Sequence, residues 1–147
     1  MRKADSRVFA VLDTNHFSEM AHHSERGASL QRRLTASGAQ VFTTIVTVQE
    51  AFEGWFALIN RQPAGRDQIR AYAQFQHCMT LLMKLTILPF DEEAADHFHR
   101  LQSERVRIGT MDLKIAAICL AHDATLLTRN LVDFEKVPGL RAENWVD

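Results

Sequence analysis

The chain has 147 residues, of which 46% are hydrophobic and 24% are charged, and its formal net charge is −1. A chain of this length and composition can fold around one hydrophobic core without disulfide or metal cross-links. The near-neutral charge excludes a strongly basic protein that holds nucleic acid by its overall field, so any such contact must come from a local patch.

The use of cysteine bears on the cellular compartment. Cys78 and Cys119 both lie in segments with a helical pattern and form no Cys-x-x-Cys pair. This usage is typical of small buried side chains in a reducing compartment. The sequence shows no signal peptide, lipidation motif or long apolar span. We therefore expect a cytoplasmic protein without membrane contact.

Strand-like and helix-like patterns alternate along the chain. Short apolar or β-branched runs predict strands, and apolar residues at three- and four-residue spacing predict helices. The expected strands are residues 8–12, 41–45, 84–88, 124–128 and 141–145. The expected helices are residues 17–37 with an interruption near Ser24 and Gly27, a helix introduced by Thr47 and broken at Gln62, and residues 67–83, 91–105, 110–122 and 130–134.

This alternation predicts a single α/β domain over residues 1–147 with a mostly parallel sheet. Residues 1–7 precede the first strand and are expected to form a flexible N-terminal extension. No internal repeat or low-complexity tract interrupts the pattern. A second domain is therefore not expected.

Four acidic side chains follow strand ends or open helices in this pattern. Asp13 ends the first strand, Glu50 lies shortly after the second, and Asp133 follows the fourth. Asp112 opens a helix that is otherwise almost wholly apolar. Because the carboxyl ends of parallel strands share one edge, where α/β proteins bind ligands, we expect these acids to reach one crevice.

Helix capping explains each acid when it is considered alone. The segment Thr47–Glu50 matches a capping box, and Thr110–Asp112 combines a cap residue with a first-turn acid that the helix dipole favours. Asn130–Asp133 suits another cap, and Asp13 can cap the helix that follows it.

The joint pattern indicates more than capping. Carboxylates packed together repel one another and are driven toward protonation unless a cation lies among them. Oxygen ligands without cysteine or histidine suit the hard cations Mg²⁺ and Mn²⁺. Such a site fits metal-assisted hydrolysis of a phosphodiester bond.

Five short motifs follow one another along the chain. They are Asp13-Thr14-Asn15 after an apolar strand, Thr47-x-x-Glu50, Arg107-Ile108-Gly109-Thr110-x-Asp112-x-x-Ile115-Ala116-Ala117, Thr128-Arg129-Asn130-x-x-Asp133-Phe134, and the tail from Val137-Pro138-Gly139-Leu140 to Glu143-Asn144-Trp145. In this order the motifs resemble the PIN-domain family, and within it the VapC-type ribonuclease toxins of toxin–antitoxin modules. The similarity extends from Val8 to Trp145.

The resemblance implies a three-layer α/β/α sandwich around a parallel sheet and Mg²⁺- or Mn²⁺-dependent endonucleolytic cleavage of RNA (tRNA, rRNA or mRNA). It also implies a homodimer and inhibition by a small cognate antitoxin. By motif, the metal-binding and catalytic acids would be Asp13, Glu50, Asp112 and Asp133, and the pocket would be lined by Asn15, Thr128 and Asn130. Family members carry either an acid or an amide at the position of Asn130.

The chain departs from the family pattern at His16-Phe17, where an aliphatic residue more commonly follows the triplet. We expect a packing or surface role for His16. The antitoxin surface is expected in the aromatic, arginine-bearing region from Trp55 to Arg70, because Trp, Phe and Arg are enriched at interfaces.

Three alternatives to a nuclease are considered. A degenerate PIN-like domain would bind RNA or protein without cutting, although such a pocket has no need to hold repelling charges together. A phospho-receiver domain would need adjacent acids after the first strand and a late lysine, and neither is present. A haloacid-dehalogenase-type phosphatase would need a second acid where Asn15 stands.

Overall fold

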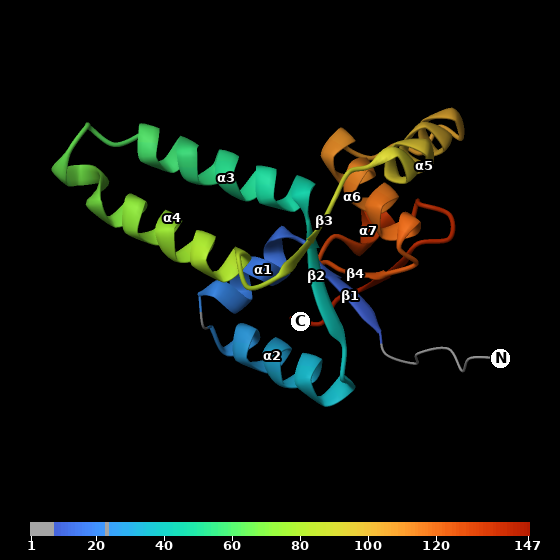
Figure 1. Ribbon diagram of the computed structural model, residues 1–147, viewed down its shortest axis with the longest axis horizontal. Coiled ribbons are helices and arrows are strands. Elements are labelled where there is room, and N and C mark those ends of the chain that lie inside the picture. The colour runs from blue at the N-terminus through green and yellow to red at the C-terminus, as the bar shows by residue number, and fades with distance from the viewer. Residues whose placement is uncertain (1–7, 23) are drawn as a thin grey trace.

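The computed structural model describes residues 8–22 and 24–147, so the extension expected at residues 1–7 lies outside the described residues. Its centre is a five-stranded sheet in the order β3-β2-β1-β4-β5, in which all four strand pairs are parallel (Figure 1). The strands are β1 (Phe9–Leu12), β2 (Gln40–Thr44), β3 (Thr86–Leu88), β4 (Thr125–Leu127) and β5 (Arg141–Glu143). The predicted α/β fold with a parallel sheet is confirmed.

Helices connect these strands and cover both faces of the sheet. They are α1 (Thr14–Ala21), α2 (Glu25–Ser37), α3 (Ile45–Asn60), the short 3₁₀ helix η1 (Arg66–Gln68), α4 (Ile69–Leu82), α5 (Glu92–Ser103), α6 (Thr110–Ala121) and α7 (Leu131–Phe134). Figure 1 shows α3 and α4 side by side as a hairpin that projects from the sheet. No helix in the described part of the chain is long and apolar enough to cross a membrane.

Two clusters of buried side chains lie on opposite faces of the sheet. Val11 and Leu126 pack with residues of α5 and α6 in one cluster. Leu12 and Leu127 pack with residues of α1, α2 and α4 in the other. Because successive side chains of a strand point to opposite faces, these memberships define three layers. The three-layer α/β/α sandwich is therefore confirmed.

The strand order changes direction between β1 and β4. The chain first builds β1, β2 and β3 outward on one side and then adds β4 and β5 on the other. Leu12 pairs with Leu127 in the register of β1 and β4, so the residues that follow both strands emerge next to each other. In a parallel α/β sheet, the crevice at such a point is the usual ligand site.

The start of α3 differs from the sequence prediction. The N-cap is Thr44, whose hydroxyl accepts the backbone N–H of Thr47 at 3.0 Å. The capping box predicted for Thr47–Glu50 is therefore wrong, and Glu50 lies in the second turn of the helix. The β-branched Ile45 suggested a longer strand, but the Thr44 hydroxyl satisfies the first helical turn and the chain leaves the sheet there.

Two further helix starts also differ from the prediction. Gly109 is the N-cap of α6, so Thr110 is the first helical residue rather than the cap. α4 begins at Ile69 rather than at Asp67, because Asp67 belongs to the preceding 3₁₀ helix. The cap of α6 is a glycine, which has no side chain, and the cap of α4 is Gln68, the last residue of the 3₁₀ helix, and sequence patterns locate such helix ends poorly.

The interruption predicted near Ser24 and Gly27 is confirmed, because α1 ends at Ala21 and α2 begins at Glu25. Ser24 caps α2 through the N–H of Gly27, and Gly38 ends that helix in the left-handed conformation. The side chains of Asp91 and Asn130 cap α5 and α7. Each of these signals involves residues only a few positions apart in the chain. The two free cysteines are buried, as expected.

Candidate active site at the carboxyl ends of the strands

Asp13 and Thr128 are the innermost polar pair of the crevice. Asp13 follows β1 and is 7% exposed, and Thr128 follows β4 and is fully buried. Asp13 Oδ1 accepts the backbone N–H of Thr14 at 2.8 Å, and Oδ2 accepts the Thr128 hydroxyl at 2.9 Å. Thr128 in turn accepts the backbone N–H of Asn130 at 3.0 Å. Each Asp13 oxygen therefore retains acceptor capacity for a further ligand.

Glu50 reaches the same crevice from α3. Its Oε1 accepts the Thr14 hydroxyl over 3.5 Å. Burial raises the pKa of the Glu50 carboxyl, and the charges of Asp13 and Asp112 raise it further. Thr14 was not among the site residues predicted from the sequence. Its position in the middle of the Asp13–Asn15 triplet was the available signal.

Asp112 enters the crevice from the first turn of α6. Burial is the largest cause that raises the pKa of its carboxyl, followed by the charges of Asp13 and Asp133, while a hydrogen bond with Asn130 lowers it. Asn130 also donates to Asp133 Oδ2 at 3.0 Å. The amide of Asn130 thus connects Asp112 with the fourth acid.

Asp133 lies at the more exposed rim of the crevice. Its side chain is 37% exposed and forms an ion pair with Lys136 at 3.5 Å. The hydrogen bond from Asn130 and the charge of Lys136 lower the pKa of Asp133, in contrast to the other three acids. Of the four acids, Asp133 is therefore the one whose ionised form its surroundings favour.

The predicted acids influence one another electrostatically. The pKa of Asp13 is raised mainly by burial, against the hydrogen bonds from Thr14 and Thr128. Asp13 and Asp112 both raise the pKa of Glu50, and Asp13 also raises that of Asp112. Burial and mutual repulsion thus both disfavour ionisation, and a cation among the carboxylates would reverse that preference.

The donor set of the crevice consists of oxygen atoms. No three Asp, Glu, His or Cys side chains gather closely enough to hold a metal ion by themselves within residues 8–22 and 24–147. Mg²⁺ commonly binds one or two carboxylates and completes its shell with water and substrate phosphate. The residues present therefore fit Mg²⁺ or Mn²⁺ with an open coordination sphere.

The two remaining residues of interest lie at the start of α1. Asn15 is exposed in its first turn, and its role in lining the pocket stays a prediction. His16 is fully buried, and its Nε2 accepts the backbone N–H of Trp145 at 3.0 Å. Of the two roles expected for His16, packing is confirmed and a surface position is not.

A groove of about 710 Å³ runs along the α3–α4 hairpin. Thr14 and Glu50 line it together with Trp55, Arg61 and Arg70. The region Trp55–Arg70, which the sequence indicated as a partner surface, therefore contributes to a groove that also contacts Glu50, whereas Asp13, Asp112 and Asp133 do not line it.

The fold and the site define the class of protein: a doubly wound parallel α/β domain with one buried carboxylate, Asp13, and two half-buried ones, Glu50 and Asp112, at its topological switch point. Residues 10–140 match the family model described as PIN domain. The chain belongs to the PIN-domain family.

Proteins named as ribonucleases are similar to this chain. It is 30% identical over 120 residues to "Ribonuclease VapC1" of Rickettsia felis, a match that covers 79% of this chain and 84% of that protein. It is 39% identical over 69 residues to "Ribonuclease VapC2" of Haemophilus influenzae, covering 44% of this chain. The latter match spans about half (52%) of that relative's length.

Solved structures share the fold. VapBC-1 from nontypeable Haemophilus influenzae superimposes with a TM-score of 0.74 at 20% identity, covering 95% of this chain and 100% of that one. VapBC-5 from Mycobacterium tuberculosis, described as a member of the VapBC family of toxin-antitoxin systems, gives a TM-score of 0.65 at 23% identity and covers 92% and 98%.

Proposed function

We propose that this protein is a metal-dependent endoribonuclease and the toxin of a toxin–antitoxin pair. The observation that carries the proposal is the set of Asp13, Glu50 and Asp112, whose charges oppose one another at the switch point of a parallel sheet. The names of the ribonuclease relatives support RNA as the substrate, in the form of tRNA, rRNA or mRNA.

In this proposal Asp13, Glu50 and Asp112, with Asp133 as the fourth acid, bind Mg²⁺ or Mn²⁺ together with water and substrate phosphate, because no three of the described side chains lie close enough to hold an ion by themselves. When bound, such a cation polarises the phosphate and offsets the charge that develops during hydrolysis. The Thr128 hydroxyl and the Thr14 N–H keep the Asp13 carboxylate in one orientation. Hydrogen bonds of this kind tune metal ligands and are needed for full activity.

The polar neighbours of the acids complete the proposed pocket. Asn130 connects Asp112 with Asp133, so it can hold the two carboxylates at a fixed spacing. Asn15 is exposed in the first turn of α1, two residues after Asp13, and in this proposal its amide donates to a phosphate oxygen of the substrate. Neither role requires Asn130 or Asn15 to bind the cation directly.

The proposed partners are a small cognate antitoxin and a second copy of the chain, in the cytoplasm. The groove lined by Trp55, Arg61 and Arg70 supports the antitoxin proposal, because a bound segment there would also cover Glu50. Toxin-antitoxin systems among the proteins that share this fold are consistent with such a pair.

The replacement Asp13→Asn tests the nuclease proposal. It keeps the size of the side chain but removes its charge, so Mn²⁺-dependent cleavage of structured RNA should fall by at least about 100-fold. The matched control is Asp123→Asn, at a carboxylate that is 89% exposed and paired with Arg141 away from the crevice. Circular dichroism establishes that both variants are folded.

Two results would contradict the proposal. Undiminished, metal-independent cleavage by the Asp13→Asn variant would exclude these acids as the catalytic centre. Binding of RNA by the native protein without any cleavage in Mn²⁺ or Mg²⁺ would instead favour the alternative, a PIN domain that acts as an RNA- or protein-binding module.

A further inference from the structure

The last four residues of the chain, 144–147, pack against the elements that carry the acidic crevice. Trp145 and Val146 are only 8% and 7% exposed. They belong to the same buried cluster as Leu12 and Leu127, the residues that immediately precede Asp13 and Thr128. We call residues 144–147 the clasp. Trp145 and Val146 are therefore part of the core, whereas Asn144 is half-buried and Asp147 is exposed.

One side of the clasp is attached to α1. The backbone N–H of Trp145 donates to His16 Nε2 at 3.0 Å in a fully buried contact. His16 lies three residues after Asp13, on the first turn of the helix that Asp13 caps. For Nε2 to accept this bond, the ring proton must lie on Nδ1, which has no partner among the described residues. The histidine thus serves as a neutral acceptor that ties Trp145 to α1.

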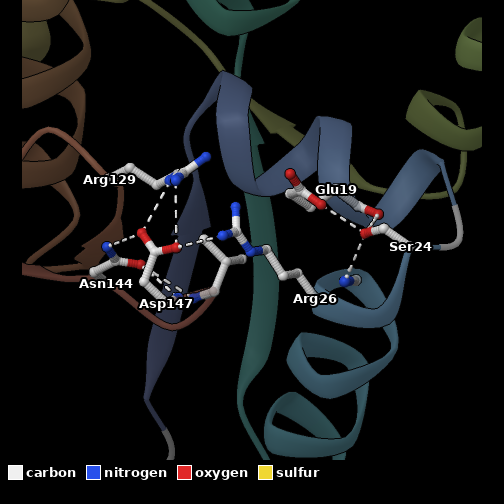
Figure 2. A network of polar contacts seen from close by, with 8 residues as sticks. Glu19, Ser24, Arg26, Arg129, Asn144 and Asp147 are labelled. Carbon is white, nitrogen blue, oxygen red and sulfur yellow. Dashed lines mark hydrogen bonds and ion pairs between the residues drawn. The ribbon is translucent and has the colours of Figure 1, made fainter.

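The other side of the clasp is attached to the segment between β4 and α7. The Asp147 carboxylate accepts from Arg129 Nε at 3.0 Å and from Arg129 Nη2 at 3.3 Å (Figure 2). Arg129 stands between Thr128 and Asn130, which are both bound to the acids. A two-point bond to a planar guanidinium restricts direction as well as distance.

Further contacts link the residues of the clasp to one another and to α2. Asn144 Nδ2 donates to Asp147 Oδ2 at 2.8 Å, and Asn144 Oδ1 accepts from the backbone N–H groups of Val146 and Asp147. Arg26 of α2 adds a second ion pair to Asp147 at 3.6 Å, as Figure 2 shows. The guanidinium of Arg33 lies 4.2 Å above the Trp145 ring.

These attachments flank the Asp13–Thr128 hydrogen bond. Asp13 and Thr128 are 115 residues apart in the chain, and each is followed closely by a residue that the clasp holds. We infer that the clasp is a positioning device for the acidic crevice, and that Asp147 and His16 act by keeping the Thr128 hydroxyl on Asp13. This inference rests on the proposed nuclease function. In this role Asp147 and His16 touch neither metal nor RNA.

The variant Asp147→Ala tests this inference in the chain of 147 residues. Loss of an outer partner of a metal ligand typically costs about 10–100-fold in metal affinity or activity. Asp147 does not bind Asp13 itself but binds Arg129, the neighbour of Thr128, so its effect on Asp13 is less direct. We therefore expect kcat for RNA cleavage to fall by about 10-fold, with KM changed less than about twofold. The Mn²⁺ dissociation constant, measured without RNA by electron paramagnetic resonance, should rise by about the same factor as kcat falls.

Two variants control for general loss of structure. Asp147→Glu keeps a carboxylate that can reach Arg129 and should restore most of kcat and of the Mn²⁺ affinity. Arg141→Gln breaks the ion pair between Arg141 and Asp123 at the amino ends of β4 and β5. This ion pair has the same length, 3.0 Å, as the one between Arg129 and Asp147. This variant should leave kcat and the Mn²⁺ affinity unchanged.

Unchanged kcat and unchanged Mn²⁺ affinity in Asp147→Ala would overturn the inference, even if its melting temperature falls. An equal loss in Arg141→Gln would overturn it as well, because the effect would then be general. A native protein that binds Mn²⁺ but cleaves no RNA would contradict the proposed function. The Mn²⁺ measurement would in that case still decide whether the clasp positions the carboxylates.

Discussion

The Thr128 hydroxyl joins two parts of the candidate site. It donates to Asp13 Oδ2 at 2.9 Å and accepts the backbone N–H of Asn130 at 3.0 Å. Because Thr128 is fully buried, no water can replace it without rearrangement. One hydroxyl therefore orients an acid and also shapes the loop that presents Asn130.

Replacing Thr128 with Val should impair both stability and activity. Valine has nearly the same shape but leaves one buried polar partner, the Asp13 carboxylate, and one half-buried partner, the Asn130 N–H, unsatisfied, which costs about 1–3 kcal/mol in the free energy of unfolding. RNA cleavage should fall by about 10-fold or more, because Asp13 loses an orienting partner. Urea denaturation and initial cleavage rates measure the two effects.

The matched control for this prediction is Thr80→Val on α4. The Thr80 hydroxyl donates to Gln76 O on the exposed side of the helix. Its removal should change the free energy of unfolding by less than about 0.5 kcal/mol. Equal effects at Thr80 and Thr128 would contradict the role assigned to Thr128.

His16 makes the stability of the fold dependent on pH. Burial is the main cause that lowers the pKa of this imidazole from 6.5 to about 4, and the charge of Arg129 adds to the effect, against Asp147 and Glu19. The unfolded chain takes up a proton near pH 6.5, whereas the native chain does so only near pH 4. Between these values the unfolded state binds more protons, so stability falls as the pH falls.

The variant His16→Gln tests this pH dependence. Glutamine can still accept the N–H of Trp145 but does not titrate, so the part of the acid sensitivity that comes from His16 should disappear. The native protein should lose up to about 3 kcal/mol more than the variant between pH 7 and pH 4, measured as urea unfolding free energies. His99→Gln, at an exposed ring on α5, should leave the native pH dependence in place.

At the scale of elements, the close approach of α1 and α2 depends on one glycine. A Cβ at Gly27 would lie 2.1 Å from the backbone oxygen of Glu19, which cannot move without shifting α1. The same residue supplies the N–H that Ser24 caps. Gly27 therefore sets how close α2 lies to the helix that Asp13 caps.

Gly27→Ala should destabilise the protein by roughly 1–3 kcal/mol, because overpacking forces the two helices apart. Gly54→Ala is the matched control, since Gly54 lies within α3 and a Cβ there meets no atom within 4 Å. That change should instead stabilise the helix by up to about 1 kcal/mol. Thermal unfolding measures both changes in stability. If both substitutions changed the stability in the same direction, the contact with Glu19 would not be important.

At the scale of the whole molecule, the fold concentrates negative charge in its crevice. The pKa values of Asp13, Glu50 and Asp112 are raised, so the native state binds more protons than the unfolded state at pH values just above their ordinary pKa values. Stability is consequently lost as the pH rises through the raised pKa values, and at neutral pH the ionised acids oppose folding. A bound cation would remove that opposition.

We therefore expect Mn²⁺ or Mg²⁺ to raise the melting temperature. At a free metal concentration of about 100 times the dissociation constant, the free energy of unfolding should rise by about 2.7 kcal/mol. Removal of metal with a chelator should reverse the increase. Asp112→Asn should raise the melting temperature without metal and reduce its increase with metal, whereas Asp123→Asn should do neither. A melting temperature that is insensitive to both cations would contradict the metal site.

The sequence by itself determined the local features of this protein. These features are the order of strands and helices, the caps at Ser24 and Asn130 and the left-handed end of α2 at Gly38. Each depends on residues only a few positions apart, where propensity and hydrogen bonding act directly. The motifs that carry the family resemblance are equally local. Local signals failed at the ends of elements, such as the start of α3 after Thr44, where strand and helix preferences compete, and the strands β3 and β5, which are shorter than predicted.

Only the tertiary structure decided which side chains meet. Asp13 and Thr128 lie 115 residues apart, and His16 and the Trp145 backbone lie 129 apart. Their contacts depend on β4 pairing with β1 and β5 pairing with β4. No periodicity within the chain specifies that order, because strand pairing is selected by the burial of both faces of the whole sheet. Each acid could be identified separately in the sequence, but only the folded sheet places the acids close to one another.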